Sequence, residues 1–201
     1  MELKKIKNEA KEALVNNRFM YFLALLVIWL ITGATSPIIG LGIILMPVFT
    51  MGIYIMSKTL IKSKNFDFNL VFTGFNDFNH ALKAIGVYLL SGLIIAAGGL
   101  LLIVPGIIFA LQYSQALYII TENKEMGVWE AMQESKRLMK GHKTELFLFH
   151  LSFILHFLLT VLTVGIYYIY FGPYYSVAKI NYYLHLTNQN INLNTEINTD
   201  Y

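Results

Sequence analysis

FMYFLALLVIWLITGATSPIIGLGIILMPVFTMGIYIMS, residues 19–57, is a stretch without a single charged side chain. Two more such stretches follow at 84–121 and 146–178, and all 15 Lys and Arg and all 12 Asp and Glu lie outside the three. A soluble domain needs charge on its exposed faces, and about a quarter of its residues are charged. Here 56% of the residues are hydrophobic and only 13% are charged, so we expect the three stretches to lie in the hydrocarbon of a membrane.

Each uncharged stretch is too long to be one membrane-spanning helix. A helix of about 38 residues would be about 57 Å long, nearly twice the hydrocarbon thickness of about 30 Å. Helix breakers stand near the middle of each stretch: Gly33, Pro37, Gly40 and Gly42 in the first, Gly98, Gly99, Pro105 and Gly106 in the second, and the weaker signal Thr163-Val164-Gly165 in the third. The sequence therefore predicts an all-α polytopic membrane protein in which about six transmembrane helices form three hairpins. The expected spans are 19–35, 40–57, 83–104, 106–121, 146–163 and 166–186.

Two other interpretations of the apolar stretches remain open. Each stretch could form a buried hairpin of a large soluble bundle, although helices that are uncharged all round offer no face to water. The N-terminus could also be a secretory signal, because a basic region precedes an apolar core and the small residues 33–36 could be a cleavage site. The second interpretation is less favoured, because a second apolar segment follows residues 33–36 within the same uncharged stretch.

Basic residues predict the orientation of the hairpins, because Lys and Arg near span ends stay on the cytoplasmic side. Five precede the first span, four lie between the second and third, five lie between the fourth and fifth, and Lys179 is near the end of the sixth. The other three connections carry none. We therefore expect a multi-pass protein of the bacterial cell membrane, with both termini cytoplasmic and three short turns outside.

The chain is expected to form one membrane domain over residues 1–186, followed by a polar, disordered tail over 187–201. A weak threefold repetition is visible, because the uncharged stretches begin at 19, 84 and 146 and each follows a polar segment with helical periodicity. The clearest such segment is 125–140, where Val128, Met132, Ser135 and Met139 share one face. We expect amphipathic cytoplasmic helices here that lie in the membrane interface or, equally, pack on neighbouring helices.

Two segments carry a family resemblance: PGIIFALQYSQALYIITEN at 105–123 and EAMQESKRLMKGHKTELFLFHLSFI at 130–154. Together with the N-terminal KNEAKEAL pattern, LTVGI at 162–166, the GPY step at 172–174 and the NYYL ending at 181–184, they resemble the bacterial integral-membrane family catalogued as domain of unknown function 975. The resemblance covers about residues 1–186, and the SKRLMKGHK block is its most specific part. Leu155 and His156 depart from the family pattern, in which Gly and Trp are expected after the segment that corresponds to 152–154.

The resemblance implies a multi-pass protein of Gram-positive bacterial membranes with no established activity. It also implies a distant similarity to membrane domains that are attached to some glycerophosphodiester phosphodiesterases. It supplies no catalytic residue, and a role for His156 would be peculiar to this chain.

Polar side chains inside the expected spans are candidate functional residues, because burying them costs free energy unless they are paired. These candidates are Gln112, Gln115, His150, His156 and Tyr174. The two histidines are six residues apart and do not share a helix face, so they do not form the i, i+4 pair of a metal site. Each candidate has an alternative role as a hydrogen-bonding group between helices.

A basic cluster between the fourth and fifth expected spans could contact lipid phosphate, since basic residues near the membrane surface attract anionic headgroups. Its members are Lys136, Arg137, Lys140, His142 and Lys143. The alternative is that these charges only set the topology.

The sequence carries no catalytic motif, and its lack of cysteine excludes thiolate chemistry. We therefore predict a protein that is not an enzyme, with no cofactor and no catalytic or metal site. The expected partners are the lipid bilayer, anionic headgroups, and a membrane-protein partner or further copies of the chain; no basic stripe suggests nucleic acid. A non-catalytic scaffold, regulatory or protective membrane component is the preferred function. The alternative is a transporter or passive conduit for small or lipid-like solutes.

Overall fold

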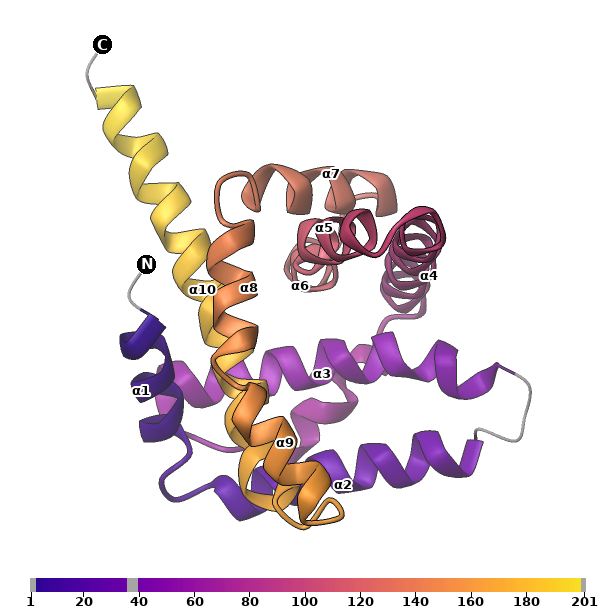
Figure 1. Cartoon of the computed structure of the whole chain (residues 1–201), viewed down its shortest axis with the longest axis vertical. Coiled ribbons are helices and arrows are strands. Elements are labelled where there is room, and N and C mark those ends of the chain that lie inside the picture. Colours follow the sequence, from indigo (N-terminus) through magenta and orange to yellow (C-terminus); the bar gives the residue numbers. More distant parts are fainter. Residues whose placement is uncertain (1–2, 36–39, 200–201) are drawn as a thin grey trace.

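The structure is a computed structural model that describes residues 3–35 and 40–199, with the side chains of 189–199 left out. The described residues form helices and connecting loops (Figure 1). The helices in chain order are α1 (Leu3–Ala13), α2 (Arg18–Thr35), α3 (Leu41–Ser63), the 3-10 helix η1 (Phe68–Phe75), α4 (Phe78–Leu101), α5 (Ile103–Tyr113), α6 (Ala116–Glu122), α7 (Val128–Leu138), α8 (Lys143–Leu151), α9 (Ile154–Leu162) and α10 (Tyr168–Thr199).

The all-helical fold class is confirmed, and five helical stretches are long and apolar enough to cross a membrane. These are Arg18–Thr35, Leu41–Ser63, Phe78–Leu101, Ile103–Glu122 and Lys143–Leu162. They correspond to the first five expected spans. The sixth expected span forms the first part of α10, which is not among the five.

The turns between paired helices lie close to where the sequence predicts them, but the second one falls before the expected boundary at residues 104–106, which lies inside α5. Leu102 has an extended backbone, with φ −161° and ψ 147°, and separates α4 from α5. Val164 and Gly165 have φ values of 51° and 88°, and they form the turn from α9 to α10. Glycine suits this left-handed conformation because it has no Cβ to clash. The weak third turn signal is therefore confirmed, whereas residues 36–39 of the first turn, Pro37 included, lie outside the described residues.

Two expected spans are interrupted in ways that the sequence analysis did not predict. The fourth span breaks between α5 and α6, and the fifth breaks between α8 and α9. The hydroxyls of Ser114 and Ser152 donate to backbone carbonyls three residues earlier, at Leu111 and Phe149. Serine that bonds back to the preceding turn competes with regular helix geometry, and such a serine stands at each of the two breaks.

The chain is arranged as three similar units that close into a ring. Each unit is a short helix followed by a helical hairpin: α1 precedes α2 and α3, η1 precedes α4 with α5 and α6, and α7 precedes α8 and α9 with α10. Each short helix packs on the second arm of the preceding hairpin: η1 on α3, α7 on α6, and α1 on α10. The threefold repetition in the sequence therefore corresponds to a cyclic arrangement in space, and the first and last helices meet (Figure 1).

Helix α10 lies in contact with α1, α2, α3, α7 and α9. Its polar side chains find partners on these neighbours. The Ser176 hydroxyl is 2.8 Å from the hydroxyl of Tyr21, and Tyr21 also lies 2.6 Å from the Ser57 hydroxyl. A helix that is covered by other helices can carry polar groups that are paired there. This explains why α10 is less apolar than the other five stretches.

The C-terminal residues from 187 onward were expected to be disordered. Helix α10 continues through Thr199, so most of this segment has a helical backbone. The side chains of 189–199 and residues 200–201 lie outside the described residues, and the disorder of the tail stays a prediction.

The contact between α1 and α10 is expected to weaken in acid. The Glu9 carboxylate accepts a hydrogen bond from the Asn181 amide at 2.8 Å and lies 2.6 Å from Nε2 of His185. Burial raises the pKa of Glu9, but the hydrogen bonds from Asn181 and His185 outweigh burial and hold the pKa below its ordinary value. A carboxyl with a depressed pKa stabilises the fold above its unfolded pKa, and this contribution is lost as the pH falls through the folded pKa. Amide hydrogen exchange in α1, corrected for intrinsic rates, should therefore speed up below about pH 4.

The variant Glu9→Gln is the control, because it cannot titrate. Its α1 exchange should vary little over the same pH range. Equal pH dependence in the variant and the parent chain would assign the effect to other groups.

Candidate functional site

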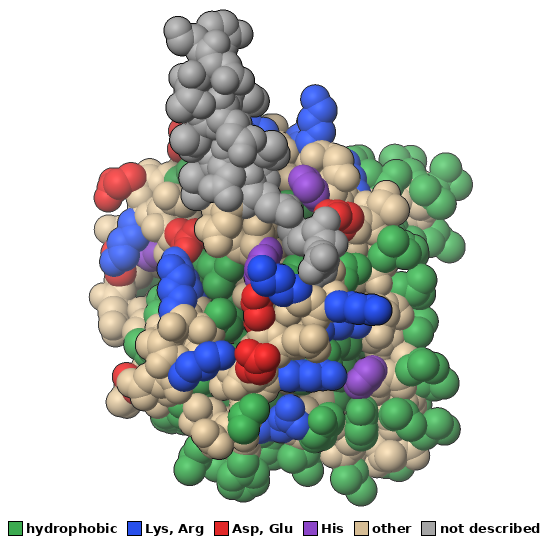
Figure 2. All heavy atoms as spheres, turned by 90° about the vertical axis from the view of Figure 1, so that its left-hand side faces the viewer, with side chains coloured by type: hydrophobic (Ala, Val, Ile, Leu, Met, Phe, Trp, Pro, Cys, Tyr) green, Lys and Arg blue, Asp and Glu red, His purple; other side chains and the backbone are tan. Residues whose placement is uncertain are grey.

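Basic side chains surround a pocket of about 410 Å³ between α5, α7 and α8. The lining residues are Gln112, Gln133, Lys136, Arg137, Lys140 and Lys143. Four of the five residues predicted to contact lipid headgroups are thus brought to one place, together with the predicted intramembrane residue Gln112. Lys and Arg side chains also gather on the face drawn in Figure 2, while hydrophobic side chains line the right and lower edges of that view.

Part of the positive charge around the basic pocket is not neutralised by carboxylates of the described residues. The Arg137 guanidinium is paired with Glu134 through two hydrogen bonds of 2.8 and 2.6 Å, and this pairing lowers the pKa of Glu134. The Lys143 ammonium donates to the Gln112 side-chain oxygen at 2.8 Å. Lys136 and Lys140 form no ion pair with any described carboxylate. Two free ammonium groups beside a guanidinium suit a phosphate or another compact anion.

The local sequence fixes the two ends of α7, the helix that contributes three of the six side chains that line the basic pocket. The Gly127 N–H donates to the Glu130 carboxylate at 2.8 Å, which caps the start of α7. Gly141, with φ +86°, forms the turn that sends the chain into α8. The predicted amphipathic helix is confirmed, and Met132 and Ser135 on its inner face are fully buried. That face packs on α4, α5 and α6.

The two predicted glutamines lie at the break between α5 and α6. The Ser135 hydroxyl donates to the backbone oxygen of Gln112 at 2.8 Å, and it accepts from the backbone N–H of Gln115 at 3.3 Å. The Gln115 side-chain amide donates to the Ser114 hydroxyl at 2.9 Å. Gln115 thus forms hydrogen bonds at the break between α5 and α6, whereas the side chain of Gln112 lines the basic pocket.

His142 does not line the basic pocket, in contrast to its predicted neighbours. Its Nδ1 lies 2.8 Å from the Glu145 carboxylate. A histidine at the start of α8 is within reach of a carboxylate three residues later on the same helix. This local pairing draws the ring away from the four basic side chains.

The remaining predicted residues lie in a separate aromatic cluster where α8 and α9 pack on α10. The His156 ring is 6.3 Å from the Tyr174 ring, and His150 is 6.1 Å from the Tyr175 ring. Phe153 lies between them, in contact with His156 at 5.8 Å. Both histidine Nδ1 atoms are buried and make no hydrogen bond within the described part of the chain. The structure therefore separates His150, His156 and Tyr174 from the glutamines.

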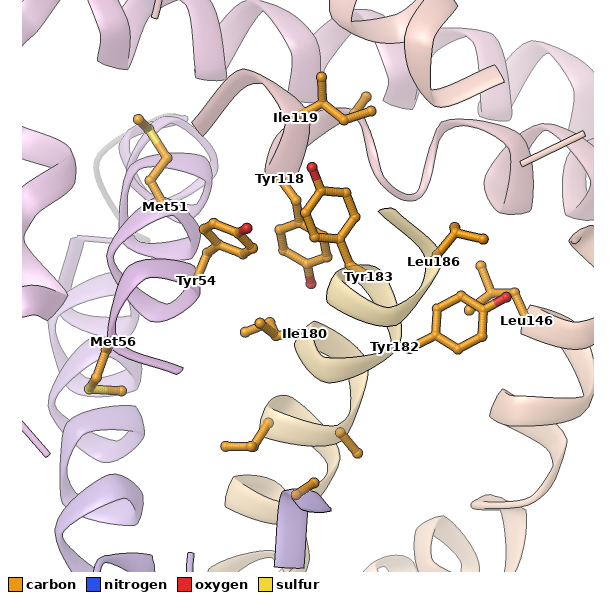
Figure 3. Close-up of a cluster of buried hydrophobic side chains, with 14 of the residues drawn as sticks. Met51, Tyr54, Met56, Tyr118, Ile119, Leu146, Ile180, Tyr182, Tyr183 and Leu186 are labelled. Carbon is orange, nitrogen blue, oxygen red and sulfur yellow. The ribbon is translucent and has the colours of Figure 1, made fainter. Parts of the chain in front are cut away.

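A polar cluster at the centre of the ring was not identified from the sequence. Tyr54 from α3, Tyr118 from α6 and Tyr183 from α10 are buried and contact one another, with ring centroids 5.1 to 5.7 Å apart (Figure 3). The hydroxyls of Tyr54 and Tyr183 donate to the Glu122 carboxylate at 2.6 and 3.0 Å. Lys58 forms an ion pair with the same carboxylate.

The three tyrosines occupy equivalent places in the three units, each on the second arm of a hairpin. The sequence does carry a signal for this, because positions 54, 118 and 183 are separated by nearly the same interval as the uncharged stretches. Isoleucine or leucine follows each of them, as Tyr54-Ile55, Tyr118-Ile119 and Tyr183-Leu184. Aligning the repeats would have pointed to the tyrosines, but not to their joint contact with Glu122.

Comparisons with known proteins give one match. A family model described as "Protein of unknown function (DUF975)" matches residues 70–190. No curated protein and no solved structure matches the chain. The matched region holds the whole basic pocket, and it also holds Tyr118, Glu122 and Tyr183 of the central cluster. Because the family model covers more than half of the sequence, the chain belongs to the DUF975 family, as the resemblance of its central segments predicted.

Proposed function

We propose that this chain is a six-span protein of the bacterial cell membrane with both termini in the cytoplasm. The five apolar stretches support the membrane location, and the first half of α10 would be the sixth span. Its Pro173, Tyr174 and Ser176 are covered by neighbouring helices or engaged with them, so they need not face lipid. The charged face in Figure 2 would lie on the cytoplasmic side.

The proposed role is non-catalytic: the protein acts as a scaffold, regulatory or protective component that holds an anionic lipid headgroup. One observation carries this proposal, the basic pocket between α5, α7 and α8. Its free lysines, Lys136 and Lys140, would meet the phosphate, and Gln112 keeps Lys143 in place beside them. A headgroup held there would fix the protein relative to the inner leaflet and leave the connecting helices open to a partner.

The transport alternative finds less support in the placement of the polar residues. Its best candidates, His150 and His156, are packed among the rings of Phe153, Phe171 and Tyr175. Both histidines are part-buried, and their aromatic neighbours give each ring a packing role between α8 or α9 and α10.

Neutralising the two free lysines should weaken the binding of anionic lipid. Each basic residue near a membrane surface contributes about 1 kcal/mol to attraction of anionic lipid. Lys136→Gln with Lys140→Gln is therefore expected to weaken binding of phosphatidylglycerol by roughly 30-fold. Native mass spectrometry of the purified protein, titrated with phosphatidylglycerol, would measure this loss.

The matched control removes the same charge elsewhere. Lys4 and Lys5 are exposed on α1, so Lys4→Gln with Lys5→Gln should leave the affinity almost unchanged. Phosphatidylcholine, which has no net charge, should bind weakly to every variant. An equal loss in both double variants would show that net charge, and not the basic pocket, attracts the lipid.

A further inference from the structure

A second cavity opens where helices of all three hairpins meet, and it shares no lining residue with the basic pocket. It has a volume of about 710 Å³ and lies between α3, α4, α5, α6 and α10. Most of its lining is apolar and comes from α4, including Leu89, Leu93 and Ile95. Cavities of roughly 300 to 1,000 Å³ are the size that small molecules and cofactors occupy. We call this cavity the α4 groove.

One cation lines the α4 groove. Lys179 of α10 contributes to its wall, and its ammonium lies 5.7 Å from the centre of the Tyr118 ring. No described carboxylate forms an ion pair with Lys179. Glu122, the carboxylate of the central cluster, is already engaged by Lys58 and two tyrosine hydroxyls. Its described neighbours are the uncharged side chains of Tyr118 and Tyr175. A lysine without an anionic partner favours a ligand that brings its own negative charge.

A second polar group of the α4 groove also lacks a partner. Ser91 lines the same cavity, is only 9% exposed, and its buried hydroxyl makes no hydrogen bond among the described residues. Buried hydroxyls are almost always paired in folded proteins, so an unpaired hydroxyl on a residue that lines a cavity favours a ligand with an acceptor, which a rotation of the short Ser91 side chain would meet.

We propose that the α4 groove binds a long-chain fatty acid from the membrane, with the carboxylate near Lys179 and Ser91 and the chain along Leu89 and Leu93. The charge of Lys179 selects an anionic head, and the apolar wall selects an alkyl chain. A single chain fits a cavity of this volume better than a two-chain phospholipid does. The proposal rests on the proposed membrane location, but it does not depend on the basic pocket.

Photolabelling would test this proposal directly. The full chain in lipid nanodiscs is exposed to a palmitate analogue that carries a diazirine on its chain, irradiated, and mapped by peptide mass spectrometry. We expect adducts within 87–96 and 113–117. Excess palmitate should remove them, whereas hexadecanol, with the same chain and no charge, should not. Lys179→Met should reduce labelling about tenfold, since a hydrogen-bonded charge contributes that much to affinity, and Lys179→Arg should retain it.

One control variant separates failure of this proposal from failure of the headgroup site. The double variant Lys136→Gln with Lys140→Gln lacks the two free lysines of the basic pocket. It should be labelled in the α4 groove to the same extent as the parent chain. If hexadecanol competed as strongly as palmitate, the proposal would be overturned. This comparison needs only the parent chain, so it holds even if Lys179→Met does not fold. Unchanged labelling of a folded Lys179→Met, or adducts confined to other helices, would also overturn it.

Discussion

Replacing Glu122 with alanine is expected to lower the free energy of unfolding by about 3 kcal/mol. The carboxylate is the shared acceptor for Tyr54 and Tyr183, which are 1% and 2% exposed. A buried donor that loses its partner costs about 1 to 3 kcal/mol, and this substitution leaves two such hydroxyls. Lys58 adds less, because its side chain is 32% exposed and water can replace the carboxylate.

Two comparisons make this prediction specific. Glu125→Ala removes an exposed carboxylate three residues away and should change the stability by less than about 0.5 kcal/mol. In a Tyr54→Phe background, one of the two hydroxyls is already absent, so Glu122→Ala should cost about 1 to 2 kcal/mol less there. Unfolding by sodium dodecyl sulfate in mixed micelles, followed by circular dichroism, would measure the parent chain and the four variants. Strict additivity of the two substitutions would mean that Tyr54 and Glu122 do not act together.

Replacing Gly52 with alanine should be at least as damaging, for a steric reason. Gly52 lies on the face of α3 that receives η1, and a Cβ there would stand 1.9 Å from the backbone oxygen of Val71. Because this neighbour is backbone, the whole of η1 would have to move. Overpacking a core costs about 1 to 3 kcal/mol when side chains can adjust, and a backbone clash should exceed about 3 kcal/mol by the same reasoning.

Gly92 provides the matched control for this substitution. It also lies inside a helix, but a Cβ there would meet nothing within 4 Å. Gly92→Ala should therefore be neutral or stabilise the protein by up to about 1 kcal/mol, as alanine favours helix over glycine. Thermal unfolding of both variants would be compared with the parent chain. Similar stability of Gly52→Ala and Gly92→Ala would contradict the close packing of η1 on α3.

The sequence was sufficient to predict the all-helical fold class and the five apolar helical stretches, because charge and helix breakers report directly on which segments can be covered by apolar surroundings. The turns at Leu102 and at Val164-Gly165 follow from this pattern. The breaks at Ser114 and Ser152 did not, since a serine can either continue a helix or bond back to the preceding turn. The unusual character of α10 was also missed, because its tolerance for polar groups depends on which helices cover it.

The candidate site was predictable to a similar extent. A basic segment on an amphipathic helix indicated the positions of Lys136, Arg137, Lys140 and Lys143, and the structure brings them around one pocket. The partner of each side chain could not be inferred, and so His142 was grouped with them although it pairs with Glu145. The cluster around Glu122 depends on three helices that are far apart in the sequence. Contacts of that kind are set by tertiary packing and not by local pattern.

The central claim is that three hairpins cross a membrane from a cytoplasmic charged face, and reporter fusions test it most directly. Alkaline phosphatase becomes active only when it is exported, because its disulfides form outside the cytoplasm. Fusions would be made after Ser36, at the first turn, and after Lys64 and Gly141, between hairpins. Activity after Ser36 together with inactivity after Lys64 and Gly141 is the expected result. Activity after Lys64 or Gly141, or inactivity after Ser36 in a stably expressed fusion, would contradict the proposed topology.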